Sequence, residues 1–186
     1  TGSAQAQRFT LQTLQREIGS SPAAARATLA GLAEREEDAD RRRELGELAA
    51  QAGALESWSK AAALDRLLLS GPLADPAEKV IIFTHYRATL ELLADRLRGM
   101  GVDFVLYHGG LANAEKDRAI RDFEQRARVL LSTEAAGEGR NLQFCRTMVN
   151  FDLPWNPQRI EQRVGRIHRV GQTRPVEVFN LSAQGT

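Results

Sequence analysis

The residues best suited to chemistry form an arginine-rich run in the last third of the chain. Arg159, Arg163 and Arg166 recur three or four positions apart, and Arg169 continues the series. On a helix this spacing places the side chains on roughly one face. Only Glu161 offsets the four positive charges, and guanidinium groups bind phosphate oxygens through paired hydrogen bonds. On charge pattern alone, a phosphate site and an exposed solubility face are equally good interpretations.

The exact residues around this run resemble a known motif. Residues 162–169 read Gln-Arg-Val-Gly-Arg-Ile-His-Arg, similar to the Gln-x-x-Gly-Arg-x-x-Arg signature of superfamily-2 helicases and translocases. The next residues, Val170-Gly171-Gln172, are similar to the ending typical of the Swi2/Snf2 branch. Upstream segments match in the expected order: residues 81–86 resemble motif IV, residues 107–110 the His-Gly element, residues 132–142 motif V, and residues 149–157 the segment joining motifs V and VI.

Several positions narrow the resemblance to one branch of this family. Arg163 and Gly165, with residues 139–141, are closer to the bacterial RNA-polymerase-associated ATPases than to eukaryotic chromatin remodellers. Residues 14–22 resemble the helical insert of bacterial members, which lies before the second motor lobe. His168 departs from the common choice in that branch. The resemblance covers residues 79–181, more than half of the chain.

The resemblance implies a role in ATP hydrolysis. In such motors ATP, with Mg²⁺, lies between two RecA-like lobes, and the second lobe supplies arginine fingers. The matching positions are Arg166 and Arg169, which would stabilise charge on the transferred phosphoryl group. Gln162 would position the nucleotide or the attacking water. The resemblance also implies a nucleotide-contacting loop made of Gly137, Glu138 and Gly139, where glycine permits close approach of the backbone.

The resemblance further implies that nucleic acid, expected to be double-stranded DNA, crosses one edge of the sheet and is held by its backbone. The expected contacts are Thr84, His85, Gly109, Ser132, Thr133, Arg140 and Asn141. Capping of strand ends is the alternative for Thr84 and Ser132. A plain hydrogen-bonding role is an equally good interpretation of His85. Three scattered histidines without a nearby cysteine do not form a metal site.

The elements that must position these residues fall into two regions. Residues 1–70 are rich in Ala, Leu, Glu and Arg and predict an α-helical insert or linking region. Residues 71–186 predict a RecA-like α/β lobe, a mainly parallel sheet flanked by helices. The expected strands are 79–84, 102–107, 128–132, 147–151 and 176–181, with helices near 90–97, 113–123 and 157–168. Ligands of such sheets bind at the carboxyl ends of the strands.

Composition excludes some classes and leaves others open. No apolar run approaches the roughly 20 residues that span a bilayer. The single cysteine, Cys145, excludes an intrachain disulfide, is expected to be a packed core thiol, and fits a reducing cytoplasm. Trp58 and Trp155 are both expected to pack, under a helix and a loop respectively. The absence of an initiator Met and the abrupt last residues suggest a piece of a longer protein.

The phosphate-binding loop of such motors is missing from the sequence. No Gly-x-x-x-x-Gly-Lys-Ser/Thr segment occurs, and in these motors that loop belongs to the first lobe. We therefore expect this chain alone not to hydrolyse ATP. Its expected partners are the first RecA-like lobe and double-stranded DNA, with RNA polymerase as a further candidate, in the nucleoid-associated cytoplasm of a bacterium.

Two rival functions remain. A dinucleotide-binding enzyme would use Gly137-x-Gly139 after a strand, but Leu142 stands where the third glycine is needed. A non-catalytic module that only grips nucleic acid or a partner would not require Gln162, Arg166 and Arg169 at this spacing. Within the motor interpretation, translocation along duplex DNA is expected rather than strand separation.

Overall fold

The chain forms a three-helix extension joined to an α/β lobe. The computed structural model describes residues 2–55, 58–133, 142–168 and 171–183, with side chains from residue 8 onward. The extension comprises α1 (Gly2–Ser20), α2 (Pro22–Arg35) and α3 (Ala39–Gly53). The lobe comprises α4 (Ser59–Ser70), a 3₁₀ turn (Pro72–Ala74), β1 (Val80–Thr84), α5 (Arg87–Gly99), β2 (Phe104–Tyr107), α6 (Asn113–Gln125), β3 (Val129–Thr133), β4 (Thr147–Asn150), α7 (Pro157–Ile167) and β5 (Glu177–Asn180).

The five strands form one parallel sheet in the order β2-β3-β1-β4-β5. In the middle strand, Ile82 lies opposite Leu131 on one side and Val149 on the other. Every residue of β1 is buried, as expected of a parallel strand that is covered on both faces. The α/β sheet, its strands and its helices confirm the predicted fold class.

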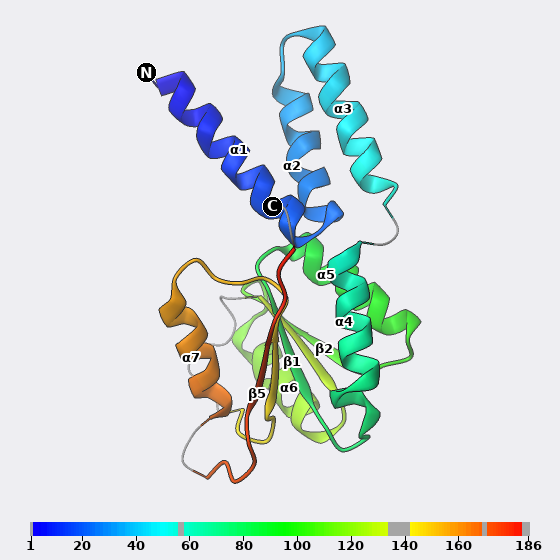
Figure 1. Cartoon of the computed structure of the whole chain (residues 1–186), viewed down its shortest axis with the longest axis vertical. Helices are drawn as coiled ribbons and strands as arrows, with labels where there is room; N and C mark the ends of the chain where they lie inside the picture. The colour runs from blue at the N-terminus through cyan, green and yellow to red at the C-terminus, as the bar shows by residue number, and fades with distance from the viewer. Residues whose placement is uncertain (1, 56–57, 134–141, 169–170, 184–186) are drawn as a thin grey trace.

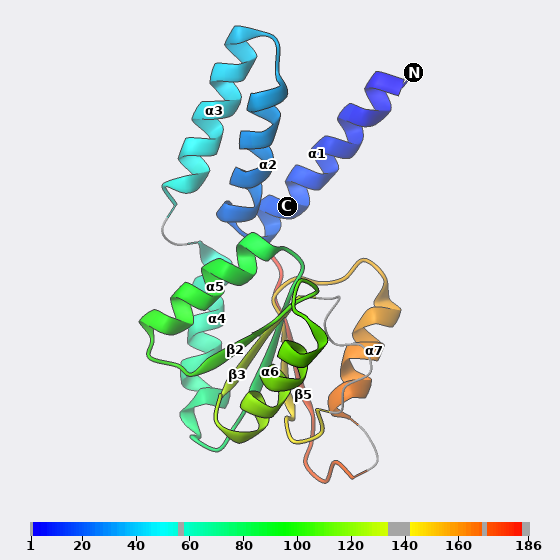
Figure 2. The ribbon, with the colours of Figure 1, turned by 180° about the vertical axis from the view of Figure 1, so that it is seen from behind.

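Each face of the sheet carries its own core. Alternate side chains of the strands, such as Ile82 and Leu131, pack with α4 and α5 through residues that include Leu68 and Leu93. The opposite face, with Ile81, Phe83, Leu130 and Met148, packs with α6 and α7 through Phe123 and Ile167. Figures 1 and 2 show α7 along the flank of the lobe that lies away from α4 and α5.

Cys145 belongs to the second of these cores. Its side chain is buried, and its Sγ lies 3.1 Å from the carbonyl oxygen of Lys79. Burial raises the pKa of the Cys145 thiol to about 12, so the thiolate is not formed at neutral pH. The predicted core thiol is confirmed.

The helical extension projects from the end of the lobe at which the strands terminate (Figure 1). Helix α2 begins at Pro22, because the Ser21 hydroxyl accepts a hydrogen bond from the Ala24 amide and proline suits the first turn. Asn113, a residue type that often caps helices, is the first residue of α6 and does not cap it. The Glu115 carboxylate instead accepts from the Ala112 amide at 2.8 Å.

Helix α4 precedes the predicted boundary between residues 70 and 71 but packs into the lobe. Its Leu64 and Leu68 are buried in the core beneath the sheet. Its Asp65 carboxylate also accepts from Arg96 of α5, with the Arg96 Nε 2.8 Å from Oδ1. The boundary at 70 and 71 stays a prediction, and this packing favours an earlier one, before residue 59. No helix in the described ranges could cross a membrane.

Candidate functional site

The carboxyl ends of the strands bring together several of the predicted nucleic-acid contacts. Thr84 at the end of β1 lies beside Thr133 at the end of β3, and His85 follows directly. His85 and Gly109 are exposed, and Thr133 is half-buried. The three residues therefore line one accessible edge of the sheet, as the topology predicts.

Two of the predicted contacts use their hydroxyl groups inside the lobe. Thr84 is buried, and its Oγ1 donates to Asp152 Oδ2 at 2.6 Å. Ser132 is buried as well, and its Oγ donates to the Thr133 carbonyl oxygen at 3.0 Å. Neither hydroxyl is presented to solvent, which favours the alternative of internal hydrogen bonding at the strand ends.

The turn after β2 holds a buried imidazole. His108 Nδ1 lies 3.1 Å from Arg87 Nη1, which donates the hydrogen bond. Burial lowers the pKa of His108, and the Arg87 charge lowers it further, so the imidazole is neutral at pH 7 and Nδ1 can accept. A Cβ on Gly110 would stand 3.3 Å from His108 Nδ1, so glycine leaves room for this turn. His108 thus shapes the turn that presents Gly109.

Asp152, directly after β4, accepts four hydrogen bonds through its carboxylate. Oδ2 accepts from Thr84 Oγ1, from the His85 amide at 2.9 Å and from Ser20 Oγ at 2.8 Å. Oδ1 accepts from Lys60 Nζ at 2.8 Å. The sequence places Asp152 in a polar segment at a strand end, but nothing in the sequence indicates partners that lie 67 to 132 residues away.

Helix α7 corrects the prediction that Arg159, Arg163 and Arg166 share one open face. Arg163 is only 6% exposed. Its Nη1 donates to Asn150 Oδ1 and to the Asp152 carbonyl oxygen at 3.3 Å, and its guanidinium lies 4.5 Å from the centre of the Phe83 ring. Because position 163 lies between Ile160 and Ile167 on the packed stripe, its long apolar stem is buried while its charge meets acceptors and an aromatic face.

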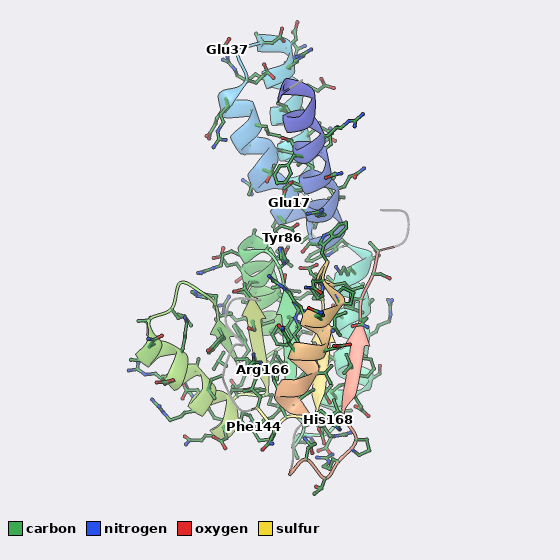
Figure 3. All side chains as sticks on the ribbon, turned by 90° about the vertical axis from the view of Figure 1, so that its left-hand side faces the viewer. Glu17, Glu37, Tyr86, Phe144, Arg166 and His168 are labelled. Atoms are coloured by element: carbon green, nitrogen blue, oxygen red, sulfur yellow. The ribbon has the colours of Figure 1, made fainter. Side chains whose placement is uncertain are left out.

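The residues predicted for ATP hydrolysis lie elsewhere on the lobe. Gln162 is exposed and Arg166 half-buried on α7. Figure 3 shows Arg166 and His168 toward the end of α7 that lies away from Tyr86 and the carboxyl edge. The Arg166 carbonyl oxygen accepts from the Leu142 amide at 3.2 Å. The other predicted positions, Gly137, Glu138, Gly139, Arg140, Asn141 and Arg169, lie outside the described residues.

The prediction for Trp155 is wrong, whereas that for Trp58 is confirmed. Trp155 is 74% exposed, and the Arg16 guanidinium of α1 lies 4.0 Å from its ring centre. The segment that carries it leads from β4 to α7, and the indole meets Arg16 of α1 instead of the interior of the lobe. Trp58 instead packs edge-on against Phe151, with ring centres 6.5 Å apart.

Beside Trp155 a hollow of about 630 Å³ opens between α1 and the carboxyl edge. Its walls include Arg16, Lys60, His85, Tyr86, Asp152 and Trp155. The hollow thus joins the helical extension to the predicted nucleic-acid edge. Among the described residues, no group of three His, Cys, Asp or Glu side chains could hold a metal ion.

Glu17 of α1 carries a buried carboxylate at the same junction, near Tyr86 (Figure 3). Its Oε1 accepts from Thr28 Oγ1 at 2.8 Å, and Oε2 has no hydrogen-bond partner in the described part of the chain. Burial raises the pKa of Glu17 above its usual value of 4.5, and the Thr28 hydrogen bond only partly opposes this. The folded state therefore favours the protonated carboxyl more than the unfolded chain does, and the charged form costs stability at neutral pH.

Replacing Glu17 with Gln is expected to raise the thermal unfolding midpoint by a few degrees at pH 7, because the amide still accepts from Thr28 without a buried charge. Because folding raises the pKa of Glu17, the wild-type protein regains the lost stability as the pH falls through the raised pKa toward 4.5, the ordinary value. Thermal melts at pH 7 and pH 4 should show the difference closing at pH 4. The exposed Glu44→Gln variant is the control, and an equal difference at both pH values would contradict the assignment.

Comparisons with known proteins agree with this architecture. Residues 59–171 match the model of the helicase conserved C-terminal domain. The chain belongs to that family. An uncharacterized ATP-dependent helicase, YqhH, of Bacillus subtilis (strain 168) is 39% identical over 96% of this chain. RNA polymerase-associated protein RapA of Proteus mirabilis (strain HI4320) is 40% identical over 64% of it.

The chain spans 32% of the length of the first relative and 13% of the second. Among solved structures, the C-terminal part of the Fun30 ATPase domain gives a TM-score of 0.67 at 20% identity, over 89% of this chain and 65% of that one. The Pyrococcus furiosus Hef helicase domain gives 0.70 at 22% identity, over 96% and 40%. These structures share the fold, and together with the relatives they confirm the resemblance to Swi2/Snf2-type superfamily-2 ATPases.

Proposed function

We propose that this chain is the second motor lobe of a Swi2/Snf2-type ATPase that moves along double-stranded DNA. The observation that carries the proposal is the separation of two sites on one lobe. His85, Gly109 and Thr133 line the carboxyl edge, whereas Arg166 lies at the far end of α7. A lobe that couples ATP hydrolysis to movement needs both a nucleic-acid surface and a separate ATP surface.

On the ATP side, Arg166 and Arg169 act as arginine fingers toward a triphosphate held by the first lobe. Gln162, exposed on α7, positions the nucleotide or the attacking water. Residues 137–139 approach the nucleotide through their backbone. ATP and Mg²⁺ are bound mainly by the first lobe, because the phosphate loop is absent from this sequence.

On the nucleic-acid side, the exposed edge binds the DNA backbone without reading sequence. His85 and Thr133 offer side-chain donors, Gly109 offers an accessible amide, and Arg140 and Asn141 are the further contacts that the resemblance implies. The partners that this function requires are duplex DNA and the first lobe of the same protein. RNA polymerase is a third partner, supported by the name of the RapA relatives, and the reducing bacterial cytoplasm is the expected compartment.

ATP turnover by the full-length protein tests the function. Linear duplex DNA should stimulate turnover at least about tenfold, and more than single-stranded DNA of equal length. The same protein should displace a third strand from a DNA triplex without separating the duplex. Equal stimulation by single strands, together with unwinding of a forked duplex, would replace the translocase with a helicase.

Trp155 provides a further test of the nucleic-acid edge. Trp155→Ala should weaken binding of duplex DNA about fivefold, since an exposed indole that is stacked with an arginine offers a flat surface for a nucleic-acid partner. Trp155→Phe retains the ring and should lose less than half of that effect. Fluorescence anisotropy of labelled duplex at fixed ionic strength measures both variants. Unchanged affinity in Trp155→Ala would remove this side chain from the DNA surface.

A further inference from the structure

We propose that Asp152 is a positioning residue. It links the carboxyl edge that binds nucleic acid to helix α7, which carries Arg166, and it fixes the helical extension onto both. The inference rests on the proposed function, since it concerns how the two surfaces of that motor lobe communicate. Asp152 lies between them and uses different atoms for different partners: its two carboxylate oxygens on one side and its backbone carbonyl on the other.

Toward the nucleic-acid edge, Asp152 holds the chain where it leaves β1. The His85 amide donates to Oδ2 at 2.9 Å and Thr84 Oγ1 donates to the same oxygen at 2.6 Å. These two bonds hold the Thr84 side chain and the N–H group of the Thr84–His85 peptide. The exposed His85 side chain is therefore presented from a backbone that Asp152 immobilises.

Toward the ATP side, Asp152 contacts α7. Arg163 donates to the Asp152 carbonyl oxygen at 3.3 Å and also to Asn150 Oδ1. Arg163 precedes Arg166 by three residues, less than one helical turn. A shift of Asp152 would therefore move the point at which α7 is tethered, close to Arg166.

The helical extension joins the same carboxylate. Ser20, at the end of α1, donates to Oδ2 at 2.8 Å, and Lys60 of α4 pairs with Oδ1 at 2.8 Å. Lys60 also donates to the Gly19 carbonyl oxygen at 3.0 Å. The Lys60 and Asp152 side chains are 6% and 9% exposed, so solvent barely screens the pair.

An asparagine cannot satisfy this arrangement. Four donors converge on two carboxylate oxygens, whereas an amide offers one oxygen and a competing NH₂ group. An NH₂ group in place of Oδ2 would face three donors, and one in place of Oδ1 would face the Lys60 ammonium. In either orientation Lys60 would lose its countercharge. The consequence for the motor is looser coupling, because DNA bound at the carboxyl edge would have less effect on the position of α7.

The experiment measures ATP turnover by the full-length protein with and without saturating duplex DNA. Its readout is the ratio of the two rates, which does not depend on the fraction of folded protein. Asp152→Asn is expected to lower this ratio about tenfold, in the range of typical coupling between sites. Lys60→Met should lower it similarly. The double variant should lose no more than the larger single effect, because both changes break one linkage.

Asp95→Asn is the matched control. It neutralises a carboxylate in an exposed ion pair with Arg98 on α5 and should leave the ratio within twofold. If stimulated and basal rates of Asp152→Asn fall together, so that the ratio is kept, the residue is only structural and the inference is overturned. Multiplicative losses in the double variant overturn it too. Absence of stimulation in wild type would instead overturn the proposed function, and this inference with it.

Discussion

Replacing Arg166 with alanine in the full-length protein is expected to lower the maximal rate of ATP hydrolysis about 10³-fold or more. The guanidinium would stabilise charge on the transferred phosphoryl group, which neither water nor a neighbouring side chain can replace in a closed interface. Binding of duplex DNA should change less than threefold, because Arg166 lies at the end of α7 that is remote from the carboxyl edge. Phosphate release and DNA anisotropy measure the two quantities.

Arg159→Ala is the control for this variant. It removes the same charge from the first turn of the same helix, at an exposed position, and should keep turnover within about threefold of wild type. Turnover that is unchanged in Arg166→Ala would favour the non-catalytic module, in which the lobe only grips nucleic acid. Loss of turnover together with loss of DNA binding would show that the two surfaces are not separate.

Arg163→Ala should act on stability rather than on chemistry. The change leaves the buried Asn150 Oδ1 without its arginine donor and removes the cation from the Phe83 ring. Breaking a buried charged contact of this kind is expected to lower the free energy of unfolding by about 3 kcal/mol. Urea denaturation of the 186-residue chain measures this loss.

Two further variants test the role of Arg163. The exposed Arg159→Ala variant should change the free energy of unfolding by less than about 0.5 kcal/mol. Arg163→Lys should recover only part of the loss, because a single ammonium cannot reach both acceptors while covering the ring. If Arg163→Ala unfolds at the wild-type urea concentration but abolishes ATP turnover in the full-length protein, Arg163 is a phosphate ligand after all.

Local patterns in the sequence predicted most of the lobe. Short apolar runs rich in β-branched residues, such as residues 79–84, are typical of buried strands, and helices between them favour a parallel sheet. The start of α2 was predictable because Ser21 and Pro22 act within one turn. The residue type of Asn113 would favour it as the cap of α6, but Glu115 supplies the cap from inside the helix.

What the sequence did not predict depends on contacts between distant segments. Spacing placed Arg163 with its neighbouring arginines, but acceptors on Asn150 and Asp152 and the ring of Phe83 draw it into the interior. Trp155 was expected to pack because indoles usually do. Asp152 had no predicted role, since its partners Ser20 and Lys60 belong to helices far earlier in the chain.

In the proposed motor this chain contributes arginines to an ATP site that it cannot complete by itself. Phosphate release by the purified 186-residue chain is measured with Mg²⁺, ATP and saturating duplex DNA, and the full-length protein is the positive control. No turnover above the buffer background is predicted for the chain, and DNA-stimulated turnover is predicted for the full-length protein. Saturable turnover by the chain alone, abolished in Arg166→Ala, would show that it holds a complete ATP site and would contradict the account.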